Sequence, residues 1–402
     1  MTKDSPIPSR LNCLDKPPSL EILDELCSRT TDPGTYPLAR SVEKNIPIYD
    51  ISTFSLSDES LIHRLQDEWH HVLSSGPGVF VTKGLYTDKD VLERTNAAYE
   101  RILAREKSLA SDDDRNTTRG DHFAANGENE RIWNSLTKHA LEDPTSFIAY
   151  FSNPWVALAC EAWLGPGYRV TTQVNIVKPG GEAQRCHRDY HLGFQTAEHC
   201  AMFPRTMQVA SQFLTLQGAV AHSDMPLASG PTRVLPFSQL FEDGFLAYRR
   251  KEFQQYFADK FVALPLEMGD GLFFNPALFH AAGANELPVT DGFERKANLI
   301  QASSALGKTM ENVDSVPIVE ACWDGIVDLL KRHGKVSREV RALVSAIGEG
   351  YPFPTNLDNR PPAPNGMAPE SEQDVILRAL EEGWSCEEVM TELRLIRKLS
   401  CA

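Results

Sequence analysis

The stretch "GEAQRCHRDYHLGF", residues 181–194, places His187, Asp189 and His191 at alternate positions just after a Pro-Gly-Gly turn. On a β-strand, side chains two residues apart point to the same side and lie about 6.6 to 6.8 Å apart. His187 and Asp189 can therefore bind one metal ion in front of the strand. His191 lies about 13 Å from His187 by the same arithmetic, so a third ligand is expected from a neighbouring strand instead.

The segment "GDGLFFNPALFHAAGANELPVTDGFERKANLIQAS", residues 269–303, supplies a candidate for that ligand. A strand-like run precedes His280, and Arg295 opens a second such run. By itself a His-x-Asp pattern is common, and a solvated polar strand is the competing interpretation. Taken singly, a buried core histidine and a surface charge would also explain His280 and Arg295. The joint order of the motifs favours a metal site over these alternatives.

A site made of His187, Asp189 and His280 would be a 2-His-1-carboxylate facial triad, a ligand set typical of non-haem Fe(II) enzymes that leaves coordination positions open. A chelating 2-oxo acid would fill two of these positions and O2 the third. Arg295 suits the distal carboxylate of such a co-substrate, because a guanidinium donates two parallel hydrogen bonds to it. The residues therefore predict oxidative chemistry that uses a metal and a 2-oxo acid.

The composition narrows the range of partners. The 402 residues carry 40 Lys and Arg against 55 Asp and Glu, a formal charge of −15, which argues against binding to nucleic acid or to an anionic membrane. No apolar run is long enough to span a membrane, and the first residues lack the apolar region of a secretory signal. The eight cysteines form no Cys-x-x-Cys pair, so we expect free thiols. These features predict a cytoplasmic protein with a small-molecule substrate; a homo-oligomer is left open.

Three regions follow from the pattern along the chain. Residues 1–45 predict an irregular arm with a short helix, and residues 46–308 a domain whose second half holds short β-branched runs punctuated by Gly, Pro and Asp. Such runs are typical of an antiparallel sandwich or barrel with helices outside. Residues 309–402 predict a helical extension, with a Pro-rich connector at about 351–369 and a terminal hairpin whose helices start at Ser371 and Ser385.

The runs expected to be strands include residues 168–179, 185–194 and 206–220, and the helix over residues 87–110 is expected to have Thr87 as its N-cap. In the first of these runs, polar side chains alternate with others. Gln173 and Asn175 therefore share a face that lines the predicted site.

With these motifs the chain resembles the phytanoyl-CoA dioxygenase-type branch of the Fe(II)- and 2-oxoglutarate-dependent oxygenases, over roughly residues 46–308. The resemblance rests on His187-Arg188-Asp189, on "DMPLASGPTRVLPFSQ" (residues 224–239), and on "GDGLFFNPALFHAAGAN" with Arg295 after it. It implies an α+β fold with a double-stranded β-helix core, also called a jelly roll or cupin-like core, with flanking helices and the C-terminal extension.

The resemblance also implies roles for particular residues. His187, Asp189 and His280 would bind Fe(II), Arg295 would hold 2-oxoglutarate, and Asn175 would lie near this co-substrate. Many relatives carry a Ser two residues after the distal His, where this chain has Ala282. Because relatives that act as halogenases have a small residue in place of the carboxylate, Asp189 favours oxygenation.

The predicted reaction is oxidation, most simply hydroxylation, of a C–H bond in a small organic molecule, with conversion of 2-oxoglutarate and O2 to succinate and CO2. Several polar and aromatic side chains near the motifs are candidates to line the substrate pocket. They are Gln173, Tyr190, His191, His122, Phe123, Arg131 and Trp133. Aromatic packing and surface salt bridges are the competing explanations for the residues of the loop over residues 111–131.

Two other classes of function fit parts of the sequence. One is a catalytically silent jelly-roll protein that binds a metal or ligand and uses the C-terminal hairpin to dock a partner. The other is a cupin-like metalloenzyme that needs no 2-oxo acid. The position of Arg295 relative to the metal ligands separates the second alternative from the oxygenase.

Overall fold

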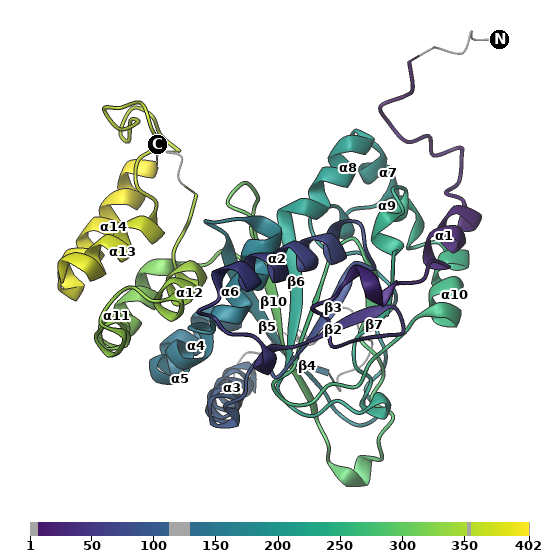
Figure 1. Ribbon diagram of the computed structural model, residues 1–402, viewed down its shortest axis with the longest axis horizontal. Coiled ribbons are helices and arrows are strands. Elements are labelled where there is room, and N and C mark those ends of the chain that lie inside the picture. Colours follow the sequence, from purple (N-terminus) through teal and green to yellow (C-terminus); the bar gives the residue numbers. More distant parts are fainter. Residues whose placement is uncertain (1–6, 112–128, 352–354, 402) are drawn as a thin grey trace.

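The computed structural model describes residues 7–111, 129–351 and 355–401, and its centre is an eight-stranded sheet (Figure 1). Neighbouring strands are antiparallel except for one parallel pair, β2 with β3. In spatial order the strands are β1 (Ser41–Glu43), β2 (Ile46–Asp50), β3 (Val79–Lys83), β8 (Gly271–Phe274), β6 (Thr215–Ala221), β10 (Arg295–Ser303), β5 (Arg169–Val177) and β4 (Asn129–Ile132).

A second, smaller sheet pairs β7 (Arg233–Leu235) with β9 (Phe279–Ala281). Single bridges extend this layer, because His187 pairs with His280 and Val234 pairs with Val262. The antiparallel strands thus form two layers, and the cavity described below lies between them. This arrangement, with helices around it, confirms the predicted α+β fold with a jelly-roll core.

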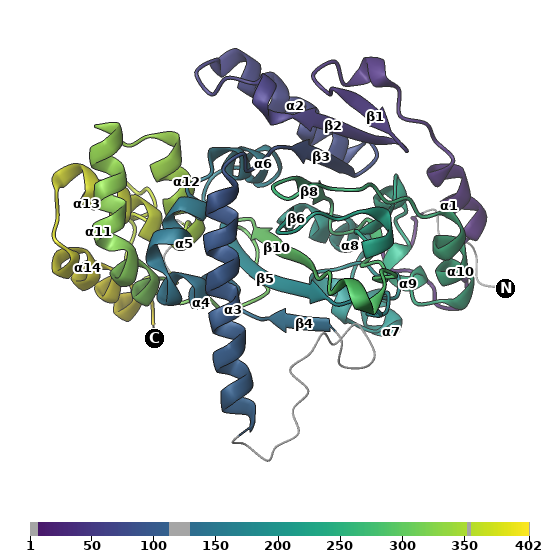
Figure 2. The same ribbon diagram turned by 90° about the horizontal axis from the view of Figure 1, so that it is seen from below.

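Helices cover the two sides of the main sheet differently. Figure 2 shows the main sheet from its edge strand β1 to its other edge strand β4. Helices α3 to α6 lie on one side of it, and α1 and α7 to α10 lie on the other. Their bounds, with those of α2, are α1 (Leu20–Cys27), α2 (Glu59–Ser74), α3 (Lys89–Ser111), α4 (Ser135–Glu142), α5 (Pro144–Phe151), α6 (Pro154–Leu164), α7 (Ala197–Ala201), α8 (Arg205–Ser211), α9 (Gly244–Ala247) and α10 (Lys251–Lys260).

Helix α2 shows how the sequence produces this packing. Asp58 caps its start by accepting a hydrogen bond from the Leu61 backbone N–H at 3.0 Å. Its apolar residues recur at three- and four-residue intervals and therefore form one stripe. The Trp69 ring in this stripe stacks on Phe80 of β3 with ring centroids 5.2 Å apart. The buried members of the stripe are Ile62, Leu65, Trp69, Val72 and Leu73.

The C-terminal extension belongs to the same hydrophobic core. It contains α11 (Ser315–His333), α12 (Arg338–Ile347), α13 (Glu372–Glu382) and α14 (Cys386–Ser400). Apolar side chains of all four helices join a cluster that also includes α2, α5 and α6. Ser371 and Ser385 form the predicted capping boxes with Asp374 and Glu388. Figure 1 shows these helices beside α4 and α5 rather than as a separate lobe.

Three predictions of local structure were wrong. Residues 185–194 form one bridge at His187 and then a 3-10 helix, His191–Phe194, instead of a continuous strand. Residues 205–211 form α8, so the expected strand begins only at Thr215. Helix α3 begins at Lys89, and Asp88 rather than Thr87 accepts a hydrogen bond at its start, from the Asp90 N–H.

Two further observations concern the chain as a whole. All eight cysteines are free, as predicted. Among the helices of the described residues, none has the length and apolar character needed to cross a membrane.

Candidate metal centre and its cavity

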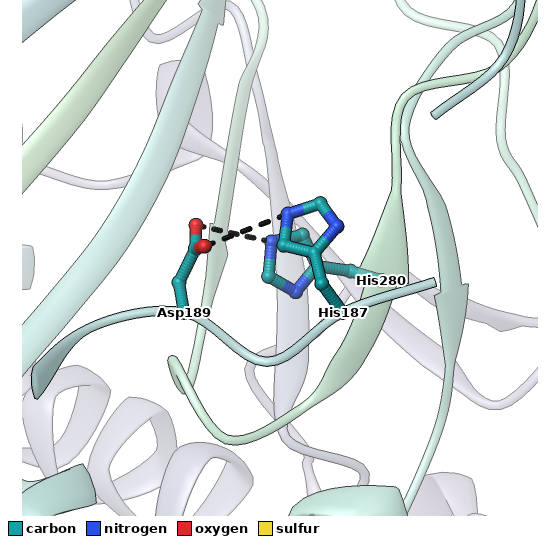
Figure 3. Close-up of side chains that lie close together, drawn as sticks. All are labelled: His187, Asp189 and His280. Atoms are coloured by element: carbon teal, nitrogen blue, oxygen red, sulfur yellow. Dashed lines mark ion pairs between the residues drawn. The ribbon is translucent and has the colours of Figure 1, made fainter. Parts of the chain in front are cut away.

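His187, Asp189 and His280 converge, as the sequence predicted (Figure 3). The His187 Nε2 atom lies 3.5 Å from Oδ1 of Asp189, and the His280 Nε2 atom lies 3.5 Å from Oδ2. Ligands about 2 to 2.2 Å from one ion and at right angles would be about 3 Å apart, so the spacing fits a shared metal. All three side chains are at most 12% exposed.

The β-structure around the triad fixes this convergence. The backbones of His187 and His280 exchange two hydrogen bonds, at 3.0 and 3.1 Å, and this bridge sets the two imidazoles side by side. The Asp189 N–H donates to the Pro276 carbonyl at 3.1 Å, which holds the carboxylate next to them. The third ligand therefore does come from a neighbouring strand, β9.

Both histidines direct Nε2, the nitrogen that would bind a metal, toward Asp189. Nδ1 of His187 lies 2.8 Å from the Arg185 carbonyl, and Nδ1 of His280 lies 2.9 Å from the Leu278 carbonyl. A carbonyl oxygen only accepts, so Nδ1 carries the proton and Nε2 keeps its lone pair in the neutral ring. Hydrogen bonds of this kind are typical of metal-binding histidines. The donor set therefore fits a divalent metal such as iron.

The charge states of His187 and Asp189 also suit metal binding. Burial lowers the pKa of His187, against the opposing pull of Asp189, so its imidazole is neutral and available as a ligand. Burial alone would raise the pKa of Asp189. The hydrogen bond that Asp189 accepts from the Gln217 amide acts against burial, and the pKa of Asp189 lies below the usual range. Asp189 is therefore an anion.

Two neighbours that the sequence analysis did not single out hold the His-x-Asp segment. Gln217 of β6 donates from Nε2 to Oδ2 of Asp189 at 2.5 Å. Arg188 points away from the cavity, where its guanidinium donates to the carbonyls of Ser238 and Phe241 at 2.6 and 2.7 Å. Alternation along the chain gave a signal for Arg188, because the residue between two ligands must face the opposite side.

Arg295 lies in the same cavity as the triad. It is 4% exposed, and its Nη2 donates to Oδ1 of Asn175 at 3.1 Å. Its Nη1 donates to the carbonyls of Gly230 and Gly283. Arg295 and Asn175 are thus neighbours, and both line the cavity with the metal ligands, as predicted for residues at a co-substrate site.

Gly230 and Gly283 allow two backbone carbonyls to accept hydrogen bonds from Arg295. A Cβ atom on Gly283 would lie 2.7 Å from Cα of Gly230, and a Cβ on Gly230 would lie 2.1 Å from the Ala284 carbonyl oxygen. Gly230 also has a φ of +74°, which strains other residues. Only glycine pairs allow two backbones this close, so their carbonyls can converge on one guanidinium.

The position that carries a Ser in many relatives is filled differently here. The Ala282 N–H donates to Oε1 of Gln184 at 3.1 Å, and the Gln184 N–H donates to the Ala282 carbonyl at 3.0 Å. Gln184 lines the cavity three residues before His187. Gln184 was not among the predicted site residues, although its place in the "GEAQRCHRD" stretch was a usable signal.

The cavity brings most of the predicted residues together. Besides the triad, Arg295 and Asn175, the predicted residues that line it are Gln173, Arg131 and Trp133. The remaining lining residues are Gln184, Phe194, Gln217, Gly218, Ala219, Met225, Thr232, Leu266, Phe274, Ala282, Ala297, Leu299, Ile300, Gln301 and Met310.

Four of the proposed substrate residues are placed elsewhere or not described. Tyr190 and His191 are not among the residues that line the cavity, because the chain turns there with φ values of +68° and +36°. The Tyr190 hydroxyl lies 2.7 Å from Oγ of Ser303 and accepts from the Met310 N–H at 2.7 Å. His122 and Phe123 lie outside the described residues.

Comparison with known families gives the same result as the geometry. The family model of phytanoyl-CoA dioxygenase (PhyH) matches residues 75–290, more than half of the chain. The chain belongs to the phytanoyl-CoA dioxygenase family. Membership confirms the resemblance stated from the motifs and agrees with the predicted class of non-haem iron, 2-oxoglutarate-dependent oxygenase. The matched range contains His187, Asp189 and His280, and Arg295 lies just beyond it.

Individual relatives are distant. The dioxygenase andF of Emericella variicolor is 26% identical over 141 residues, which are 33% of this chain and 43% of that protein, so the match spans less than half of the curated relative. Among solved structures, the non-heme alpha ketoglutarate dependent epimerase SnoN from nogalamycin biosynthesis has a TM-score of 0.41 and 18% identity, covering 62% of this chain and 84% of its own. The carbocyclase SnoK from the same biosynthesis has a TM-score of 0.41 and 17% identity, covering 61% and 86%.

Proposed function

We propose that this member of the phytanoyl-CoA dioxygenase family is an Fe(II)- and 2-oxoglutarate-dependent dioxygenase that hydroxylates a C–H bond of a small organic molecule. The observation that carries the proposal is the convergence of two histidine Nε2 atoms and one carboxylate on a cavity that also contains Arg295. The reaction balances as C–H plus O2 plus 2-oxoglutarate giving C–OH, succinate and CO2.

His187, Asp189 and His280 would hold the iron from one side, through Nε2, a carboxylate oxygen and Nε2. Iron with 2-oxoglutarate would supply the activation of O2 and the oxidation of the C–H bond. The chain's own contribution is to keep Nδ1 of each histidine protonated, to keep Asp189 anionic and to orient the co-substrate. Arg295, held by Asn175 and two carbonyls, would bind the distal carboxylate of 2-oxoglutarate.

The cavity would also restrict water around the reacting groups. The triad is largely buried, and Phe274 of β8 lies against His280 with ring centroids 4.7 Å apart. Apolar walls favour an oriented substrate over free solvent near the metal. The structure thus supports oxygen chemistry on a substrate that enters the cavity, with the site of hydroxylation set by substrate placement.

The direct test is spectroscopic and anaerobic. Fe(II) and 2-oxoglutarate are added to the purified protein, and the weak visible charge-transfer band of the chelate is recorded. We expect the band in the wild type, its loss in His187→Ala and its weakening in Arg295→Ala. Folded, iron-loaded wild-type protein without the band would reject the oxygenase and favour the cupin-like enzyme. Protein that forms the band but decarboxylates no 2-oxoglutarate with any substrate would favour the silent binding protein.

A further inference from the structure

Three glutamines form a row across the end of the cavity that is remote from Arg295. Gln217 of β6 lies directly opposite Gln301 of β10, and Gln173 of β5 lies opposite Leu299, two residues from Gln301 on the same face. Direct cross-strand partners have Cβ atoms about 4.5 to 5.5 Å apart. Gln301 is six residues beyond Arg295, about 20 Å along β10. The cavity therefore has a cationic end and an amide end.

The amide groups at this end have unused hydrogen-bonding capacity. Gln217, Gln301 and Gln173 are 4%, 4% and 1% exposed. Within the described part of the chain, the Oε1 atom of each is buried and has no hydrogen-bond partner. Buried polar atoms are nearly always paired, so three neighbouring exceptions that line one cavity point to a ligand.

The contact of Gln217 with Asp189 shows which atom of the Gln217 amide is available to a ligand. Its Nε2 donates to Asp189, and a carboxylate can only accept, so the other amide atom must be the oxygen. In the same way Nε2 of Gln173 faces the Met310 sulfur at 3.2 Å, which leaves its oxygen. Gln217 and Gln173 therefore offer acceptors, and the unpartnered Oε1 of Gln301 lies on the residue opposite Gln217, so a ligand that completes the row must donate O–H or N–H groups.

The surroundings of the row are apolar and nearly balanced in charge. Phe274 lies opposite Gln217 on β8, and Leu299 and Met310 also line this part of the cavity. Glu311 accepts a hydrogen bond from the Asn134 N–H at 2.6 Å. Burial raises the pKa of Glu311, and Asn134, Gln173, Lys138 and Arg131 act against that rise, so this carboxyl group lies near the row and near the Arg131 charge. These walls suit an apolar body better than a charged one.

Resting on the proposed function, we infer that the substrate is an uncharged molecule with a mainly apolar body and a hydroxyl group, which donates to the amide oxygens of Gln217 and Gln301. Gln217 then joins the substrate to the metal centre, because the same amide holds Asp189. The C–H bond presented to the iron lies within a few atoms of that hydroxyl. Gln301 and Gln173 act as specificity residues, whereas Gln217 also acts as a positioning residue for the iron ligand.

The test compares probes that differ only in their ability to donate. Cyclooctanol, cyclooctanone, methoxycyclooctane and cyclooctanecarboxylate are titrated into the protein, and binding is followed by saturation-transfer NMR. We expect cyclooctanol to bind roughly 3- to 10-fold more tightly than the ketone and the ether, the value of one hydrogen bond. In Gln301→Met this preference should fall to less than about twofold, whereas the exposed glutamine variant Gln255→Met should keep it.

The same titrations separate this inference from the proposed function. They are run on the protein as purified and again with Fe(II) and 2-oxoglutarate under nitrogen, where the charge-transfer band reports the metal site independently. A missing band with a retained alcohol preference would reject the oxygenase alone. No alcohol binding, equal binding of alcohol and ketone, tightest binding of the carboxylate, or an unchanged preference in Gln301→Met would overturn the inference. If Gln301→Met does not fold, Gln173→Met is the second variant and should also reduce the preference.

Discussion

Two pairs of buried histidines lie on opposite faces of the main sheet. His187 and His280 face the cavity, and His139 and His222 lie among the helices on the other face. In the first pair each Nδ1 is tied to a local carbonyl, so both Nε2 atoms are directed at Asp189. In the second pair Nε2 of His139 lies 2.8 Å from the Ser146 hydroxyl, and Nε2 of His222 lies 3.0 Å from the Tyr150 hydroxyl.

The difference shows what qualifies a buried histidine as a candidate metal ligand. Both pairs are largely buried: burial lowers the pKa of His187, and it lowers the pKa values of His139 and His222 to about 3. Only the first pair shares a carboxylate and opens on a cavity. Among the described residues, the first pair with Asp189 is the sole group of three side chains placed to ligate a metal.

The largest expected effect is a loss of iron binding when a histidine of the first pair is replaced. Replacement His280→Ala removes a ligand, so we expect Fe(II) affinity to fall by more than about 100-fold, beyond the range for loss of an outer-shell contact. Anaerobic titration against a competing chelator measures it. The control, His222→Ala, should bind Fe(II) as the wild type does. Iron binding by His280→Ala within a few-fold of wild type would remove His280 from the metal site.

The second-largest effect is a loss of stability when a histidine of the second pair, His139 and His222, is replaced. His222→Ala removes one hydrogen bond each from the Tyr150 hydroxyl and from Oδ1 of Asn96 and opens a cavity, so the free energy of unfolding should fall by about 3 kcal/mol. Urea denaturation measures this change. The exposed control His63→Ala should change it by less than about 0.5 kcal/mol. A His222→Ala protein of unchanged stability would show that this network is not structural.

A third substitution tests how Asp189, the carboxylate beside the first pair, is held in place. Gln217→Met removes the N–H that Asp189 accepts while all three ligands remain, so Fe(II) affinity should drop by about 10- to 100-fold. In the matched variant Gln255→Met the changed residue is exposed and does not line the cavity, so the affinity should be unchanged. Wild-type affinity in Gln217→Met would mean that the backbone alone positions Asp189.

The last prediction is a pH dependence of stability that His139 and His222 contribute. The pKa values of His139 and His222 are about 3 in the fold, against an unfolded value near 6.5, so the unfolded chain binds more protons in between. Stability should therefore decline as pH falls from 6.5 towards 3, by up to about 1.4 kcal/mol per pH unit for each histidine. Urea denaturation of His222→Gln between pH 5.0 and 6.5 should show a correspondingly shallower slope. An equal slope in both proteins would contradict a neutral, buried His222.

The convergence of His187, Asp189 and His280 could be predicted because its signal is mostly local. Alternation along one segment places His187 and Asp189 on one side, and His280 follows a recognisable strand with Arg295 beyond it. The same alternation placed Gln173 and Asn175 on the lining face of β5, where both lie. Capping boxes at Ser371 and Ser385 are also local, and both were predicted correctly.

Features that depend on distant contacts could not be predicted. Gln217 and Gln301 each sit on an alternating strand, but only the sheet register places them opposite each other. The turn at Tyr190 and His191 uses positive φ values that are uncommon outside glycine, so a strand was expected there. Helix α8 follows Pro204, and contacts of Gln208 with the Cys200 and Phe203 carbonyls override its β-branched composition.

The last helix of the chain holds a wall of the cavity from outside the jelly roll. Arg397 of α14 pairs with Asp314 and donates to the Ser315 hydroxyl at 2.8 Å, only a few residues beyond Met310 of the cavity lining. The segment between β10 and α11 is thus anchored at its far end by a surface residue. A substitution of Arg397 would therefore reach the cavity wall only through this segment, without contact with His187, Asp189 or His280.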